Sequence, residues 1–204
     1  MRLRAAHSRR GLSTLEVLVT VALLAVVAAK VVLVSSSAST ASNNDLASIV
    51  AEDQARQTLD RIAYSVMGAD RDNIDPSAQA PAFSSQIRYR LSLGVENGKV
   101  VWDDPEEILL DDDDGKLRWI ENPGTAGARS VVWCDAVRQL LEGELQNGKD
   151  DNGNGLIDES GLVFEIDGNA ITITLTLERA GKGGTTNPST VSTTVTCRQA
   201  PPAN

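Results

Sequence analysis

The sequence predicts an α+β fold in which one long helix comes first and antiparallel strands follow. An apolar run covers residues 17–34, and helical spacing of apolar residues continues to Val66. Beyond residue 80, apolar and polar residues alternate, as in half-buried strands. This order is typical of α+β proteins and not of a parallel α/β sheet. The 204 residues, of which 41% are hydrophobic, suffice for one globular domain and an additional segment.

The composition argues against several classes of function. A net charge of −9 does not favour binding to nucleic acid or to an anionic membrane surface. The chain has one histidine, His7, and its removal by processing would exclude Ser-His-Asp, Cys-His and His-ligated zinc sites. Paired carboxylates for glycoside hydrolysis are compatible with the composition, but no motif supports them. We therefore expect a protein that is not an enzyme.

The N-terminus combines a basic segment with a hydrophobic one. Four arginines stand in residues 1–11, and residues 17–34 are apolar except for Lys30. As a helix, this stretch is about 27 Å long, close to the hydrocarbon thickness of a bilayer. Positive charge stays on the cytoplasmic side, so the N-terminus is expected inside and Ser35 onward outside.

Two general explanations of this segment are a secretory signal peptide, with a small-residue cleavage site at Ser36-Ser37-Ala38, and a plain signal anchor. Neither explains Glu16. A carboxylate in an apolar run costs roughly 2.5–3.5 kcal/mol at mid-membrane and less near the interface. An acid at this place is by default a functional feature that needs a partner.

Residues 9–16, Arg-Arg-Gly-Leu-Ser-Thr-Leu-Glu, followed by an apolar helix, resemble the processing site of type IV prepilins and type II secretion pseudopilins. The resemblance implies that prepilin peptidase cuts after Gly11 and that Leu12, where phenylalanine is usual, is N-methylated. It also implies that Glu16 pairs with the N-terminal amine of a neighbouring subunit. Such pairing is physically reasonable, because a buried charge is tolerable mainly when it is paired.

The resemblance implies a cleaved leader of residues 1–11, a long helix of residues 12–68 that spans the membrane from about 15 to 34, and a head of residues 69–204. It implies a minor pilin or pseudopilin in the bacterial inner membrane, with a cytoplasmic N-terminus and a periplasmic head, that later enters a type IV pilus or secretion pseudopilus, at initiation or at the tip. The implied partners are prepilin peptidase, inner-membrane lipid and, through the helix, other subunits.

The second half of the helix is predicted to be amphipathic and to end near Gly68. Residues 35–44, SSSASTASNN, are poor helix formers, so either a hinge or continuous helix is expected there; the resemblance favours continuous helix packed on a sheet. The apolar positions at helical spacing are Leu46, Ile49, Val50, Leu59, Ile62, Ala63 and Val66.

The head is predicted to contain strands at residues 87–93, 99–102, 116–120, 162–166, 170–177 and 191–197, and a short helix is possible within 134–145. The segments 87–91 and 115–118 and the paired C-terminal strands resemble the J-type pseudopilin and the W-type minor pilin. The acids at 103, 104, 106, 107 and 111–114 are predicted to form a solvated edge, with a second cation site as the alternative.

Residues 147–159 contain the spacing of a calcium-binding loop and resemble the opening of an EF-hand and thrombospondin type 3 repeats. Ile157 is expected to anchor the loop to the core. The twelfth position, a glutamate in EF-hands, is Gly161, so weak affinity of about 10⁻⁴–10⁻³ M is expected. An Asn- and Gly-rich surface turn is the alternative. The expected ligands are Asp150, Asn152, Asn154, the carbonyl of Leu156, and Asp158 or Glu159.

Cys134 and Cys197 are both expected outside the membrane, where disulfides persist. Paired, they would enclose 62 residues and stabilise the head by about 4 kcal/mol; two unpaired thiols are the alternative.

For the whole protein, the alternatives to a filament subunit are a secreted or anchored calcium-dependent binding module and a membrane-tethered hydrolase.

Overall fold

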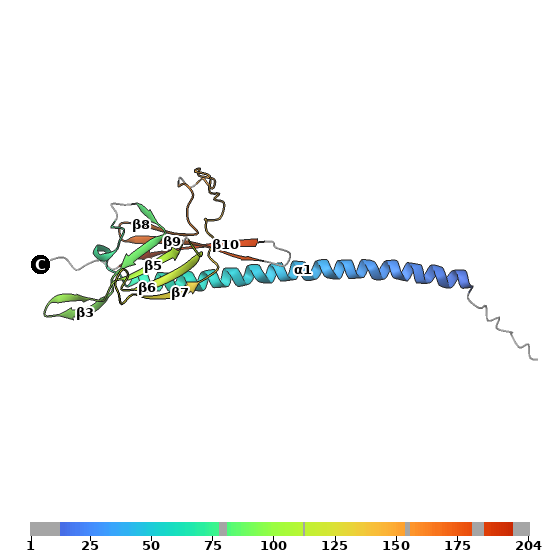
Figure 1. Ribbon diagram of the computed structural model, residues 1–204, viewed down its shortest axis with the longest axis horizontal. Coiled ribbons are helices and arrows are strands. Elements are labelled where there is room, and N and C mark those ends of the chain that lie inside the picture. Colours follow the sequence, from blue (N-terminus) through green and yellow to red (C-terminus); the bar gives the residue numbers. More distant parts are fainter. Residues whose placement is uncertain (1–12, 78–80, 112, 154–155, 181–185, 198–204) are drawn as a thin grey trace, which may run out of the picture. The chain divides into compact units, whose positions relative to one another are not determined.

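The structure is a computed structural model that describes residues 13–77, 81–111, 113–153, 156–180 and 186–197. The described residues form two compact units, which lie within Met1–Asn43 and Asn44–Asn204. Figure 1 shows the elements along the chain. They are α1 (Thr14–Met67), η1 (Arg71–Asn73), β1 (Ala82–Ser84), β2 (Gln86–Tyr89), β3 (Ser92–Glu96), β4 (Lys99–Trp102), β5 (Glu106–Asp111), β6 (Lys116–Glu121), β7 (Arg129–Cys134), β8 (Leu162–Asp167), β9 (Ala170–Ala180) and β10 (Thr186–Thr196).

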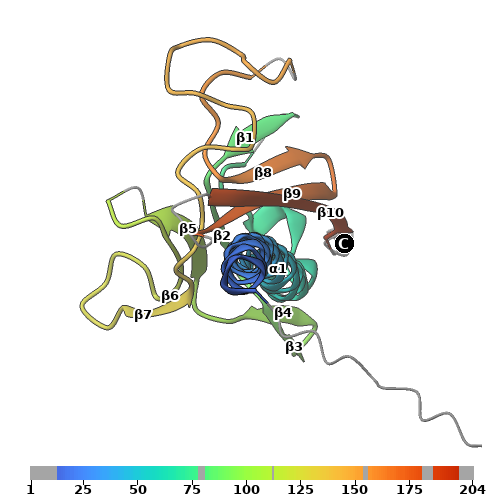
Figure 2. The same cartoon turned by 90° about the vertical axis from the view of Figure 1, so that its right-hand side faces the viewer.

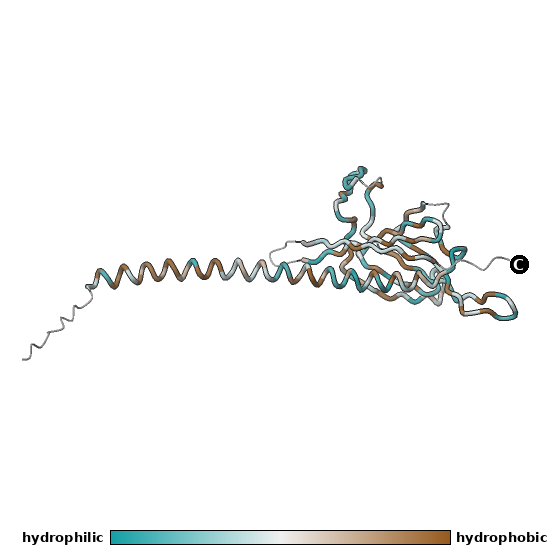
Figure 3. Tube along the Cα trace, turned by 180° about the vertical axis from the view of Figure 1, so that it is seen from behind, coloured by the Kyte–Doolittle hydropathy of each residue, from teal (hydrophilic) through white to brown (hydrophobic). Residues whose placement is uncertain are grey.

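The first unit contains the first half of α1. Its large apolar side chains are exposed on every side of the helix, from Leu15 to Val34. Figure 3 shows this apolar run along the helix. An 18-residue window of α1 has a mean hydropathy of 2.9, and α1 is the one helix in the described part of the chain that is long and apolar enough to cross a membrane. The finding agrees with the predicted membrane anchor.

The serine-rich segment 35–44 is helical, so continuous helix and not a break is what the structure contains. Hydroxyl groups of this segment donate to carbonyls one turn earlier. Ser36 Oγ lies 2.9 Å from the Leu33 oxygen, and Thr40 Oγ1 lies 3.0 Å from the Ser36 oxygen. These bonds satisfy the hydroxyl groups on the helix itself, which makes poor helix formers compatible with helical backbone.

In the second unit, one stripe of α1 is buried at three- and four-residue spacing. The predicted burial of Leu59, Ile62 and Val66 is confirmed, and Ala63 packs against the core, but the prediction was wrong for Leu46, Ile49 and Val50, which are exposed. The small residues Ala51 and Ala55 are fully buried, so the buried stripe runs through them and not through Leu46, Ile49 and Val50. The buried stripe is Ala51, Ala55, Thr58, Leu59, Ile62 and Val66.

The helix ends at Met67, one residue before the predicted stop at Gly68. Gly68 also stands where there is little room for a side chain. A Cβ atom added there would lie 3.1 Å from Leu91 Cδ2, which is tighter than ordinary contact. A side chain at this position would require Leu91 to shift by a few tenths of an ångström.

The head is built from antiparallel strands, which confirms the α+β class. One sheet has the order β2-β5-β6-β7, the other has the order β1-β8-β9-β10, and β3 and β4 form a separate hairpin. Figure 2 shows the two sheets on different sides of the second half of α1. The inward side chains of both sheets and the buried helix stripe make one core, whose largest fully buried side chains are Tyr89 and Phe164.

Most predicted strands are confirmed, with shifted ends. The predicted strand 87–93 is divided between β2 and β3, which belong to different sheets. The possible helix within 134–145 is absent from this described segment. Its backbone bonds to β9 instead: Val137 bridges to Leu177, and the Arg138 N–H donates to the Thr176 oxygen at 3.0 Å. The apolar residues of segment 134–145 are therefore spaced for a backbone that runs along the edge of β9, and not for a helix.

The prediction of a solvated acidic edge was wrong for its first half, which contains β5, an inner strand of its sheet. Glu106 accepts hydrogen bonds from Tyr89 Oη at 2.7 Å and from Trp119 Nε1 at 2.8 Å. Glu107 is buried and pairs with Arg88 at 3.1 Å. The sequence pattern did not predict this strand, because acidic residues usually face solvent. Here their hydrogen-bond and ion-pair partners lie on the neighbouring strands β2 and β6.

Candidate functional site

The first candidate site is the start of α1. Gly11 and Leu12 lie outside the described residues. Glu16 is exposed in the first turn, and its backbone N–H donates to Ser13 Oγ at 3.3 Å. A carboxylate in the first turn interacts favourably with the positive end of the helix dipole. The exposed Glu16 side chain is therefore placed where a second chain can reach it.

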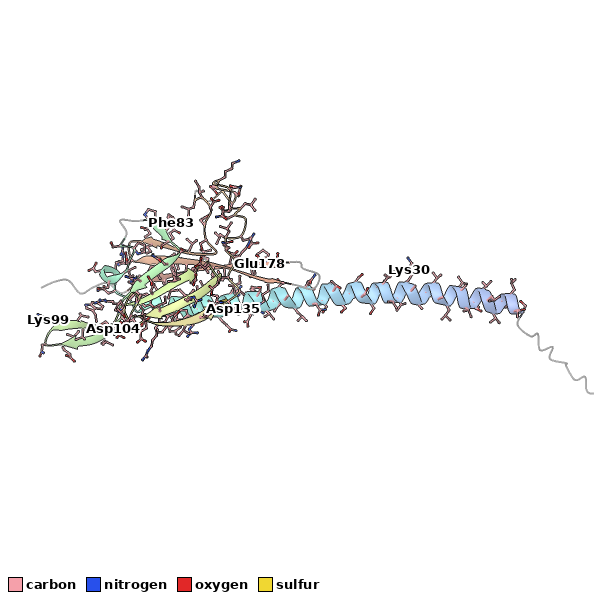
Figure 4. All side chains as sticks on the ribbon, in the orientation of Figure 1. Lys30, Phe83, Lys99, Asp104, Asp135 and Glu178 are labelled. Atoms are coloured by element: carbon pink, nitrogen blue, oxygen red, sulfur yellow. The ribbon has the colours of Figure 1, made fainter. Side chains whose placement is uncertain are left out.

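The helix that follows Glu16 has an apolar surface on all sides. Leu18, Leu24 and Val32 are each exposed by more than 60%. Lys30 is the charged residue within residues 17–34, and Figure 4 shows its side chain extending outward from the helix. A helix that is hydrophobic all round needs an apolar environment, which lipid or neighbouring helices can provide.

The second candidate site is the loop of residues 147–159, in which two predicted calcium ligands accept backbone hydrogen bonds. The Asp158 carboxylate accepts the N–H groups of Asn147 at 3.0 Å and Gly148 at 2.9 Å. Asp150 Oδ1 accepts the Gly153 N–H at 2.6 Å. Asp158 has a φ of 50°, in the left-handed region. These contacts tie the side chains of Asp150 and Asp158 to the backbone of the described part of the loop.

Ile157 does not anchor the loop, because it is 61% exposed and that prediction was wrong. The loop is attached through its ends instead. The Leu141 N–H donates to the backbone carbonyl oxygen of Glu159 at 2.8 Å, and Leu140 forms a β-bridge with Ser160. Leu156 is half-buried, and Asn154 lies outside the described residues.

Two buried carboxylates meet at Asn152. Glu144 Oε1 accepts the Asn152 backbone N–H at 3.1 Å, and Glu159 Oε2 lies 3.4 Å from Asn152 Nδ2. Sequence reasoning found Asn152 and Glu159 but missed Glu144, which precedes the motif and carries no spacing signal. The structure thus brings together two of the predicted ligands and one unexpected carboxylate.

The described part of the chain has no group of three or more His, Cys, Asp and Glu side chains placed to hold a metal ion. Calcium also takes amide and backbone oxygens, so a set with two carboxylates and an asparagine has the right chemistry for this cation. Sites for zinc or copper, which depend on imidazole or thiolate, are a poorer fit to these oxygen donors.

The predicted disulfide is wrong, because both cysteines are free and buried. Gln54 Nε2 lies 3.4 Å from Cys134 Sγ, whereas Cys197 Sγ lies 3.9 Å from the Val66 oxygen. The two sulfur atoms therefore contact α1 at residues twelve positions apart, and no bond joins them. Burial raises the pKa of Cys134, and it raises the pKa of Cys197 to about 11.

The acids near residue 114 are paired within the chain, which argues against a second cation site. Arg118 contacts Asp111 at 3.0 Å and Asp114 at 2.5 Å, and Lys116 contacts Asp114 at 2.8 Å. The hydrogen bond from Lys116 is the main cause that lowers the pKa of Asp114. Lys116 and Arg118 of β6 therefore neutralise the carboxylates that a bound cation would otherwise neutralise.

No protein-family model, curated protein or solved structure matches this chain. Its function must therefore be argued from the residues and contacts described above.

Proposed function

We propose that the protein is a minor structural subunit of a type IV pilus or of a type II secretion pseudopilus. The observation that carries the proposal is the division of α1. Its first half is apolar on all sides and exposed, and its second half has one stripe buried in a β head. A helix of this kind has one half available to lipid or to other helices while the other half holds the head.

The N-terminal motif explains how such a helix would leave the membrane. Cleavage by prepilin peptidase after Gly11 produces a positively charged amine at Leu12. An unpaired Glu16 carboxylate costs up to roughly 2.5–3.5 kcal/mol in the membrane, and pairing with the amine of a neighbouring subunit removes much of that cost. Glu16 would thus select the position at which a new subunit enters the filament.

The exposed apolar residues of the second half of α1 fit the same role. Leu46, Ile49 and Val50 are exposed by 56%, 62% and 48%, next to the residues that bury in the head. In a filament these side chains would contact helices of other subunits. Burial of this stripe would add to the free energy of association in proportion to its apolar area.

We also propose that the loop of residues 147–159 binds calcium weakly and stabilises the head. The contacts that support calcium are those of Glu144 and Glu159 with Asn152. They equally favour a second candidate function, a secreted or membrane-anchored calcium-dependent binding module in which the apolar helix serves only export or anchoring.

N-terminal mass spectrometry of the chain purified from its own membranes separates the two functions. A filament subunit should begin with N-methylated Leu12. A chain that begins at Ser39 would refute the filament proposal and support export by a signal peptide.

The Glu16→Gln variant tests assembly directly. We expect cleavage to continue and incorporation into the sheared filament fraction to fall by about tenfold or more, since a loss of ~1.4 kcal/mol is tenfold in an equilibrium. Glu52→Gln is the matched control, because Glu52 is exposed on the same helix and pairs only locally with Arg56 at 2.7 Å. Equal incorporation of both variants would contradict the role of Glu16.

A further inference from the structure

Glu144 is the most deeply buried carboxylate among the described residues, at 1% exposure. Its Oε1 atom accepts the Asn152 N–H, and its buried Oε2 atom has no hydrogen-bond partner. A buried acceptor without a partner costs about 1–3 kcal/mol, and more when it is charged. Buried polar atoms in native structures are nearly always hydrogen-bonded, so this oxygen needs an explanation, and a bound ion is one.

No cation of the described chain pairs with Glu144. None of the ion pairs between described residues includes it. Glu144 lines an open hollow of about 580 Å³ whose walls also include Arg138 and Glu178, but Arg138 pairs with Glu178 at 3.2 Å. Among the described residues that line the hollow, Arg138 is the one with a positive charge, and it is already paired with Glu178.

Gly161 explains why the closing ligand cannot come from the position that an EF-hand uses. A Cβ atom added to Gly161 would lie 1.8 Å from the Arg138 carbonyl oxygen, and the Gly161 N–H donates to the Gln139 oxygen at 3.1 Å. No side chain fits there without displacing backbone. A carboxylate that closes the site must come from another segment.

Glu144 lies on the segment that is tied to the end of the loop. Two backbone contacts hold the segments together. Leu140 forms a β-bridge with Ser160, and the Leu141 N–H donates to the backbone carbonyl oxygen of Glu159. Glu159, itself 9% exposed, contacts the same asparagine as Glu144. The two carboxylates thus converge on Asn152 from opposite ends of the loop.

We propose that Glu144 supplies the closing carboxylate of a calcium site, together with Glu159 and Asn152. The inference rests on the proposed calcium role of the loop and not on filament assembly. Calcium would neutralise both glutamates and give the buried Oε2 atom a partner. Calcium accepts irregular sets of carboxylate and amide oxygens, whereas magnesium demands near-octahedral geometry, so calcium is the better fit.

The test is calcium titration by calorimetry of the full chain in detergent, with melting followed by tryptophan fluorescence in calcium and in chelator. Glu144→Gln keeps an acceptor for the Asn152 N–H and removes the charge. We expect about tenfold weaker binding or more and loss of most of the calcium-dependent rise in Tm. Glu142→Gln is the matched control: Glu142 is exposed, contacts Thr190 at 2.7 Å, and its change should alter affinity by less than about twofold.

Each outcome decides a different claim. Equal affinity of Glu144→Gln and the unaltered chain would overturn the role of Glu144 and leave the calcium loop intact. Absence of binding up to about 10 mM, above the range of extracellular modules, would overturn both. Filament incorporation is measured separately, so neither result affects that proposal.

A second variant covers the case in which Glu144→Gln does not fold. Asn152→Asp adds a third carboxylate where Glu144 and Glu159 meet. It should lower Tm in chelator by repulsion and tighten calcium binding about threefold or more. Unchanged or weaker binding in this variant would overturn the proposed site.

Discussion

Replacing Ile62 with alanine tests the packing of the second half of α1. Ile62 is fully buried, and it shares the core with Leu59, Val66 and the inward residues of both sheets. The change removes three carbon atoms, which at ~0.8 kcal/mol each lowers the free energy of unfolding by about 2.4 kcal/mol through lost transfer from water. The cavity left behind raises the loss to about 3–4 kcal/mol.

The loss converts to a measurable shift in Tm. For a domain of this size each kcal/mol moves Tm by about 2–4 °C, so Ile62→Ala should lower it by about 6–16 °C. Tryptophan fluorescence of the full chain in detergent follows the transition, because Trp102, Trp119 and Trp133 all lie in the head.

Ile49→Ala is the control, since it makes the same change on the same helix at a position that is 62% exposed. It should alter stability by less than about 0.5 kcal/mol. Similar shifts for the two variants, or a loss below about 1 kcal/mol for Ile62→Ala, would refute the assignment of the buried stripe.

Four other predictions concern the polar groups and the thiols of the head. Glu106→Ala should destabilise the head by about 1–3 kcal/mol for each buried donor left unpaired, which chemical denaturation measures. The same change should lower the pKa of Tyr89, because burial and then the Glu106 charge raise that pKa above its usual range. Absorbance at alkaline pH measures the second effect. Mass spectrometry without reductant should detect two thiols after denaturation and slow alkylation in the native state. Because folding raises the pKa of Cys197 from 9.0 to about 11, its contribution to stability is present below pH 9.0 and lost as the pH rises toward about 11; Cys197→Ala should remove that part of the pH dependence. Asp114→Asn should be less stable than the unaltered head at pH 7 and equally stable once the pH falls below the lowered pKa of Asp114, a difference that salt should reduce.

The loop of residues 147–159 illustrates how far local patterns can reach. The spacing from Asp150 to Glu159 predicted a loop, and the described residues 150–153 and 156–159 belong to no helix or strand. The pattern did not show that Asp158 would accept the N–H groups of Asn147 and Gly148, or that Ile157 would face solvent. Those outcomes depend on how neighbouring segments approach the loop, which residue spacing does not encode.

The sequence by itself determined the order of the fold: an apolar helix, its amphipathic continuation, an end beside Gly68, and antiparallel strands. These features follow from periodicity and from glycine, which act over a few residues. The tertiary structure decided which helix stripe is buried, where the acids of β5 find partners, and which part of α1 each cysteine contacts. It also brought Glu144 to Asn152 and the Arg138 carbonyl against Gly161. The physical reason is that burial and pairing depend on groups far apart in the chain, and only the packed strands and helix bring those groups within contact distance.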